Sequence, residues 1–99
     1  MIHSKDKNPE KIFKFAKKFR QNYPNITLVS VPTSYNSVTE KQLINEGFNI
    51  VIYANHLLRA AYPAMQNVAQ QILKNKRAYE IEKNLLSIKK ILKLIPGTE

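Results

Sequence analysis

Three short polar stretches of this 99-residue chain carry side chains that could bind a ligand. They are His3-Ser4-Lys5, Pro32-Thr33-Ser34-Tyr35, and Ala54-Asn55-His56, which Arg59 follows. Each stretch comes after a short apolar run, and in α/β folds ligands meet the carboxyl ends of strands and the loops that follow them. Because all three contain hydrogen-bonding side chains, we expect them to hold part of a ligand.

Each stretch also has a purely structural interpretation. Serine, threonine and asparagine occur at helix caps and turns in any protein for local backbone reasons. We interpret Ser34 and Ser37 in this way, whereas both interpretations stay open for His3 and Thr33. A lone histidine such as His56 is more typical of a structural role.

Several kinds of chemistry are excluded by composition. The chain has no cysteine, which rules out a disulfide, a cysteine-ligated metal and a thiol nucleophile, and its two glycines do not allow a glycine-rich phosphate loop. Asp6 is the only aspartate, and the six glutamates lie in predicted helices or at the terminus. We therefore predict no metal site and no catalytic residue in this chain, only residues that bind substrate.

The net charge of +9 suggests a basic module that binds nucleic acid or an acidic partner as one alternative. Most lysines and arginines lie within residues 5–20 and 74–93, on the polar faces of predicted helices. Aromatic residues do not alternate with them on any predicted strand, so nucleic acid is the less favoured partner. Without a signal peptide or an apolar run of roughly 18 residues, we expect a soluble, cytoplasmic protein with no membrane partner.

The elements that position these stretches begin with a short strand at residues 1–4. Asn8 can cap the helix that follows, and Pro9 suits its first position. Apolar residues then recur at helical spacing, which predicts a helix to about residue 22. The β-rich run at residues 26–31 predicts a second strand.

The second half predicts a helix at residues 39–46, ended by Gly47 in the left-handed conformation. Residues 48–53 are nearly all apolar, which predicts a parallel strand covered on both faces. A long helix from about residue 57 can tolerate Pro63 in its first turn or at a kink. A last amphipathic helix ends at Pro96-Gly97, and its apolar positions are Leu85, Ile88, Leu92 and Ile95.

This alternation of strands and helices predicts an α/β fold with a parallel sheet and right-handed βαβ units. No linker divides the chain, so we expect residues 1–99 to form one unit. Three parallel strands leave two open sheet edges, and the first strand is very short. We therefore expect the chain to be part of a larger fold.

Five segments carry a resemblance to a known family. They are IHSK, NPEKIFKFAKKF, LVSVPTSY, GFNIVIYANHLLRAAYPAMQNVAQQIL and SIKKILKLIPGTE. In this order they resemble the C-terminal part of the phosphoenolpyruvate mutases, in the isocitrate lyase and phosphoenolpyruvate mutase superfamily. The most specific piece is YANHLLRAAYPAMQ.

The resemblance implies a (β/α)8 TIM barrel of about 250 residues, of which this chain supplies roughly the last three βα units plus the C-terminal helices. It also implies conversion of phosphoenolpyruvate to phosphonopyruvate, which forms a carbon–phosphorus bond in phosphonate biosynthesis. By resemblance, His3 helps to hold the phosphoryl group and Thr33 contributes a hydroxyl to substrate binding. Asn55 and Arg59 match the family motif, and we assign them to packing at the barrel end and to helix positioning.

Family members bind Mg²⁺ through acidic residues on earlier strands and close a loop bearing lysine and asparagine over the substrate. This chain contains none of those positions, so we expect it to bind no metal and to be inactive alone. The family also implies a homo-oligomer that exchanges its last barrel helix. Thr33-Ser34-Tyr35-Asn36 has one aromatic residue where the family often has two, so the sister phosphonopyruvate hydrolases stay an alternative.

Overall fold

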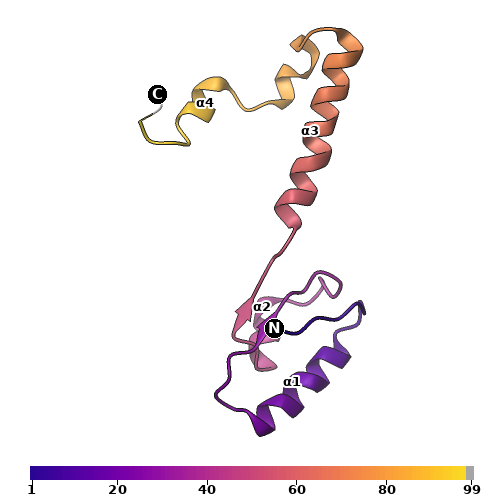
Figure 1. Ribbon diagram of the computed structural model, residues 1–99, viewed down its shortest axis with the longest axis vertical. Coiled ribbons are helices and arrows are strands. Elements are labelled where there is room, and N and C mark those ends of the chain that lie inside the picture. Colours follow the sequence, from indigo (N-terminus) through magenta and orange to yellow (C-terminus); the bar gives the residue numbers. More distant parts are fainter. Residues whose placement is uncertain (98–99) are drawn as a thin grey trace. The chain divides into compact units, whose positions relative to one another are not determined.

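The computed structural model describes residues 1–97 and contains two parallel strands and five helices. In chain order these are α1 (Glu10–Asn22), β1 (Val29–Ser30), α2 (Glu40–Asn45), β2 (Ile50–Val51), α3 (His56–Asn75), the 3₁₀ helix η1 (Tyr79–Asn84) and α4 (Ile88–Leu92) (Figure 1). The chain divides into two compact units, Met1–His56 and Leu57–Glu99. The three polar stretches belong to the first unit, except for Arg59.

The first unit is built around three parallel extended segments. Strand β1 pairs with β2 in parallel, with Val29 opposite Ile50. Ile2 forms a parallel bridge to Ser30, and its backbone N–H donates to the carbonyl of Val29 at 3.0 Å. The predicted parallel order is therefore confirmed in this unit. The strands are shorter than predicted, because the paired ladder covers only Val29–Ser30 and Ile50–Val51.

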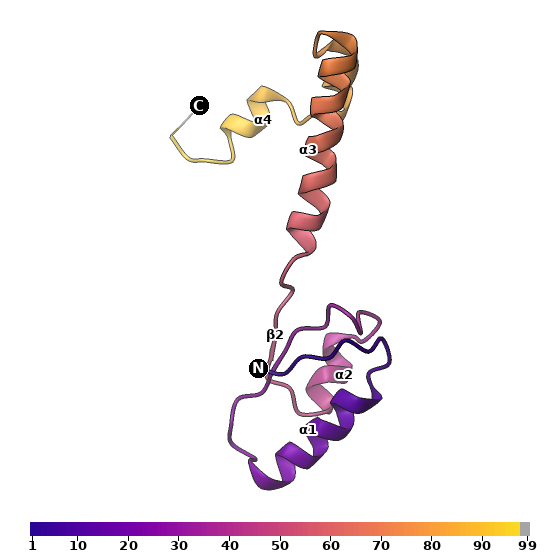
Figure 2. The same cartoon turned by 45° about the vertical axis from the view of Figure 1, so that its right-hand side comes forward.

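One face of this small sheet is covered by α1 and α2, which lie next to each other (Figure 2). Their side chains meet residues near the strands in one buried cluster, which comprises Ile12, Ala16, Leu28, Tyr35, Leu43 and Phe48. Val51 packs against this cluster, whereas Ile50 and Ile52 are 48% and 41% exposed. The expectation of a strand covered on both faces at residues 48–53 is wrong here, because strand side chains alternate between faces and the helices cover one.

The N-cap residue of α1 is Pro9, which makes no side-chain cap hydrogen bond, so the predicted cap at Asn8 lies one residue too early. Helix α2 begins with a side-chain cap at Thr39. The Asn8 side-chain carbonyl accepts a hydrogen bond from the Glu10 N–H at 3.0 Å, and the Pro9 carbonyl accepts the first helical bond. In α2, Thr39 and Gln42 form a reciprocal capping box. Each cap fixes the point at which a loop from the carboxyl end of a strand enters its helix.

A guanidinium clamp holds the opposite end of this unit together. Arg20, in the last turn of α1, donates two hydrogen bonds to the Gly47 carbonyl at 2.6 and 2.9 Å and a third to the Asn49 side chain. It also donates to the carbonyl of Ile26 at 2.6 Å. Gly47 has φ +100°, which confirms the predicted left-handed helix end. The clamp therefore joins α1 to the segments that enter β1 and β2.

In the second unit, α3 contains Pro63 beyond its first turn, and it is followed by Lys76 in the left-handed conformation with φ +56°. Ile81 of η1 is buried. None of the helices described within residues 1–97 is long and apolar enough to span a membrane.

The predicted last amphipathic helix is wrong in its extent. Leu85 is extended, with φ −98° and ψ 149°, and Ile95 follows the end of α4. The Ser87 hydroxyl accepts a hydrogen bond from the Lys90 N–H at 3.3 Å, so the helix starts after this cap. A serine cap within the apolar pattern therefore divides the segment into η1 and α4.

Candidate functional site

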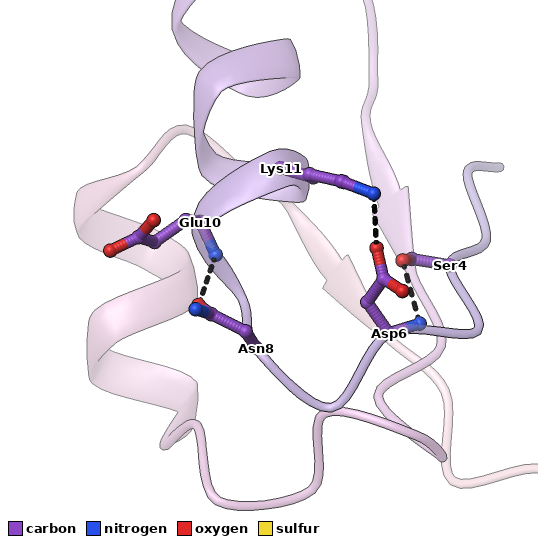
Figure 3. Close-up of polar contacts among 5 residues, drawn as sticks. All are labelled: Ser4, Asp6, Asn8, Glu10 and Lys11. Carbon is purple, nitrogen blue, oxygen red and sulfur yellow. Dashed lines mark hydrogen bonds and ion pairs between the residues drawn. The ribbon is translucent and has the colours of Figure 1, made fainter.

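The loop after the first extended segment is fixed by its own polar side chains (Figure 3). The Ser4 hydroxyl accepts a hydrogen bond from the Asp6 N–H at 3.2 Å. The Asp6 carboxylate forms an ion pair with Lys11 at 2.8 Å, and its hydrogen bond followed by its charge raises the pKa of Lys11. The Asn8 side chain then accepts a hydrogen bond from the Glu10 N–H. The one carboxylate of this loop is therefore already paired with α1.

The loop after β1 is anchored by a buried tyrosine. Tyr35 is completely buried, and its hydroxyl lies 3.0 Å from the hydroxyl of Ser30, which is also buried. The Thr33 N–H donates to the Val31 carbonyl at 2.9 Å, which turns the chain directly after the strand. Burial of Tyr35 thus determines where the polar residues around it lie.

The two loops border a pocket of about 450 Å³, which we call the lysine pocket. Its lining side chains can all donate a hydrogen bond, and they are Lys5, Lys7, Thr33, Ser34, Asn36 and Ser37. None of them is a carboxylate. Within residues 1–97, neither lysine forms an ion pair. The pocket therefore offers two cations and four neutral donors to a ligand.

Of the two predicted substrate-binding residues, one lines the lysine pocket. Thr33 is half-buried and lines the lysine pocket. His3 is exposed and is not among the residues that line it. Ile2 packs against the buried cluster, so alternation along an extended chain places His3 on the face that α1 and α2 leave uncovered.

The third polar stretch does not join the lysine pocket. The Tyr53 hydroxyl donates to the Glu40 carboxylate at 2.8 Å, and the Tyr53 and His56 rings meet edge to face at 5.7 Å. The Asn55 side-chain carbonyl is enclosed without a partner among the described residues. In the second unit, Arg59 borders a separate hollow with Leu58, Tyr62 and Pro63.

Sequence reasoning missed part of the lysine pocket. Lys5 was among the candidate residues, but Lys7 was not, and Ser34 and Ser37 were interpreted as turn residues. Both serines lie in the loop after β1, and both also line the pocket. Lys7 follows the turn in which the Asp6 N–H donates to the Ser4 hydroxyl, so no local sequence pattern assigns it to the pocket.

The acidic and histidine side chains decide whether the part of the chain that the structure describes can hold a metal ion. It contains no group of three or more histidine, cysteine, aspartate or glutamate residues that could hold a metal ion. Asp6 is paired with Lys11, and Glu40 accepts the hydrogen bond of Tyr53. These residues do not fit a magnesium site by themselves.

Solved structures of two enzymes have a similar backbone fold over most of this chain. A crystal structure of phosphoenolpyruvate phosphomutase from Streptomyces platensis subsp. rosaceus superposes with a TM-score of 0.83 at 30% identity, over 94% of this chain and 31% of that one. A phosphonopyruvate hydrolase in complex with oxalate and Mg²⁺ superposes with a TM-score of 0.77 at 36% identity, over 94% of this chain and 32% of that one. The chain thus aligns with about a third of each of these enzymes.

Sequence comparison gives the same result. Over 95% of its own length, the chain is 32% identical to phosphoenolpyruvate phosphomutase of Tetrahymena pyriformis. Over the same share of its length, it is 37% identical to phosphonopyruvate hydrolase of Variovorax sp. (strain Pal2). It spans 30% and 32% of the length of these relatives. The profile of the family described as "Phosphoenolpyruvate phosphomutase" matches residues 1–73. The chain therefore belongs to the phosphoenolpyruvate phosphomutase family.

Proposed function

We propose that this chain supplies the phosphoryl-binding side of a (β/α)8 enzyme that interconverts phosphoenolpyruvate and phosphonopyruvate. The observation that carries the proposal is the set of parallel segments at Ile2, β1 and β2, whose carboxyl ends carry His3 and the loop with Thr33. Ligands in barrels of this kind bind at the carboxyl ends of the strands. The sheet face with Ile50 and Ile52 would then turn toward the interior of the barrel.

In this proposal, His3 and Thr33 bind the group that is transferred. Within residues 1–97 the His3 imidazole and the Thr33 hydroxyl make no hydrogen bond, so both can donate to phosphoryl oxygens. A histidine suits a phosphoryl group because its charge can follow that of the ligand. These residues hold and orient the phosphoryl group, and neither is assigned as the group that breaks or forms the phosphorus bond.

In this proposal, Mg²⁺ would be bound by residues that do not belong to this chain. When bound, the ion would neutralise charge on the substrate oxygens. The phosphonopyruvate hydrolase relative was solved with oxalate and Mg²⁺, whereas the described residues of this chain offer no ligand cluster. We therefore expect the 99-residue chain alone to convert neither phosphoenolpyruvate nor phosphonopyruvate.

A phosphonopyruvate hydrolase is the second candidate. The chain is 37% identical to the Variovorax hydrolase and 32% identical to the Tetrahymena phosphomutase. The hydrolase would cleave phosphonopyruvate with water to pyruvate and phosphate, whereas the mutase would return phosphoenolpyruvate. Both reactions need the same phosphoryl-binding residues, so the site described here serves either one.

The two candidates can be separated in a chimera. The first two thirds of the Tetrahymena phosphomutase would be joined to this chain in place of its own C-terminal third, and the matching chimera would be made with the Variovorax hydrolase. Each is incubated with phosphonopyruvate and Mg²⁺ and followed by phosphorus NMR. We expect a phosphoenolpyruvate signal from the first chimera. Phosphate release by both would favour the hydrolase, and no turnover by either would contradict the proposed function.

A further inference from the structure

We propose that three aromatic residues on one side of α1 form a docking surface for the helix of the preceding βα unit in the larger barrel. These residues are Phe15, Phe19 and Tyr23, and we call them the aromatic stripe. The proposal rests on the barrel of the proposed function, but it concerns the assembly of the outer ring of helices and not the ligand-binding end of the sheet. The occupant is a helix that presents an apolar face to α1.

The aromatic stripe follows α1 and its C-terminal cap at a spacing of four residues. The Phe15 and Phe19 rings stack with their centroids 5.6 Å apart, and the centroids of Phe19 and Tyr23 lie 5.2 Å apart. Phe15 is 41% exposed and Tyr23 is 51% exposed, whereas Phe19 packs against the buried cluster. Contiguous apolar side chains at the surface of a soluble protein are typical of contact surfaces.

The aromatic stripe lies on the side of α1 that faces away from α2. Lys17 borders a hollow together with Asn45 and Glu46, which lie at the end of α2, so the Lys17 side of α1 is turned toward α2. Phe15 precedes Lys17 by two positions, which at 3.6 residues per turn places it about 200° around the helix. Ala16, between the two in sequence, is completely buried. The core therefore lies between the α2 side and the aromatic side of α1.

The order of the sheet puts a preceding unit on this same aromatic side. The Ile2 segment pairs with β1, and β1 pairs with β2. A barrel strand that precedes the Ile2 segment would pair at its outer edge, away from β1. Its helix would then lie beside α1 on the side opposite α2, because the helices of a (β/α)8 barrel follow the strands in an outer ring. The chain spans 30% and 32% of two relatives, so most of this ring would lie outside it.

The aromatic stripe is held in place before a partner arrives. The Arg20 guanidinium carbon lies 5.9 Å from the centroid of the Phe19 ring. The same guanidinium is fixed by its two hydrogen bonds to the Gly47 carbonyl. Its charge is thus held near the ring, a favourable arrangement for an aromatic side chain. A surface with fixed side chains loses less entropy when another helix packs on it, which favours association.

Thiol labelling measures whether the aromatic stripe is covered. The chain has no cysteine, so Phe15→Cys introduces its only thiol, both in the 99-residue chain and in the chimera with the Tetrahymena phosphomutase described above. Mass spectrometry of the peptide that contains residue 15 would follow the rate of labelling by a soluble maleimide. We expect labelling to be at least about tenfold slower in the chimera, because a buried thiol reacts only after local opening.

Lys14→Cys is the matched control. Lys14 is exposed and lies two positions from each of the buried residues Ile12 and Ala16, so it points away from the core. Its thiol should be labelled at rates within about twofold of each other in the two proteins. Tyr23→Cys, at the other end of the aromatic stripe, repeats the test if Phe15→Cys disturbs folding.

The possible outcomes separate this proposal from the proposed function. Equal labelling rates of Phe15→Cys in the two proteins would overturn it, and so would a chimera that does not unfold cooperatively, because its two parts then share no interface. Slow labelling in the 99-residue chain that becomes fast on dilution would also overturn it, since a second copy would then cover the aromatic stripe. A chimera that protects Phe15→Cys but does not convert phosphonopyruvate would support this proposal and contradict the proposed function.

Discussion

At the scale of single residues, the contact between Arg20 and Gly47 determines how the strands enter the sheet. The guanidinium donates to the Gly47 carbonyl from two nitrogens and to the Ile26 carbonyl from a third. A Cβ atom on Gly47 would lie 2.9 Å from the Arg20 Cγ. This glycine is therefore required both by its backbone conformation and by the close approach of the arginine.

We expect Gly47→Ala to lower the free energy of unfolding by about 2 kcal/mol, since it combines a left-handed backbone with a steric clash. Gly97→Ala is the matched control, because Gly97 also has a positive φ, of 84°, but has open space around its Cβ position. It should cost about 1 kcal/mol or less. Urea titrations of both variants measure the difference. Equal costs would show that Arg20 does not restrict this position.

The hydrogen bond between Tyr53 and Glu40 predicts a pH dependence. The bond, followed by burial and the negative charge of Glu40, raises the pKa of Tyr53 above 10.0. The neutral phenol is thus favoured in the folded chain, so the bond stabilises the fold below pH 10 and is lost as the pH rises through the folded pKa.

An ultraviolet titration tests this prediction. The difference in absorbance between the wild type and Tyr53→Phe isolates the titration of Tyr53 from that of the other tyrosines, of which the chain has five in all. Tyr53 should titrate above the ordinary pKa of a tyrosine. Glu40→Gln should bring this pKa back toward 10, because the charged acceptor is removed. A Tyr53 that titrates at the ordinary value in the wild type would contradict the hydrogen bond.

At the scale of helices and strands, local signals predicted where the helices of the first unit begin. Asn8 with Pro9 marked the start of α1 to within one residue, and Thr39 with Gly47 marked the two ends of α2. These signals act over a few residues, so they can be read from the sequence. The apolar runs also predicted parallel strands, but not how short the paired ladder is.

The rest of the fold depends on contacts that no local pattern contains. The uncovered face of β2 and the clamp of Arg20 arise from segments far apart in the sequence. Thr33 was proposed as a site residue and lines the lysine pocket, whereas Lys7 was missed. Its position depends on the turn that Ser4 and Asp6 make in space.

The end of α3 offers a test of backbone strain. Lys76 has φ +56°, a conformation that costs a side-chain-bearing residue roughly 1 kcal/mol or more. We expect Lys76→Gly to raise the free energy of unfolding by about 1 kcal/mol. Lys74→Gly, within the last turn, should lower it by about the same amount. Thermal unfolding distinguishes the two, and a loss of stability in both would contradict the left-handed helix end.

At the scale of the whole molecule, we propose that the chain forms homo-oligomers. Large apolar side chains of the second unit are exposed, and they include Leu57, Leu58, Tyr62, Met65, Leu73, Ile88, Leu94 and Ile95. Burying such side chains against another chain is favourable by roughly 25 cal/mol per Å². Light scattering should give a mass above the 11.5 kDa of one chain. A monomer at all concentrations would contradict this proposal.

The most direct test of the central claim measures kinetics in the chimera with the Tetrahymena phosphomutase. His3→Ala should lower kcat/KM for phosphonopyruvate by about 100-fold, the usual cost of removing one donor to a charged oxygen in an active site. Thr33→Val should lower it about tenfold, since a neutral donor is lost. Thr27→Val, an exposed threonine before β1 at the opposite end of the sheet, should change it less than twofold. Wild-type kinetics in His3→Ala would contradict the claim that this chain binds the phosphoryl group.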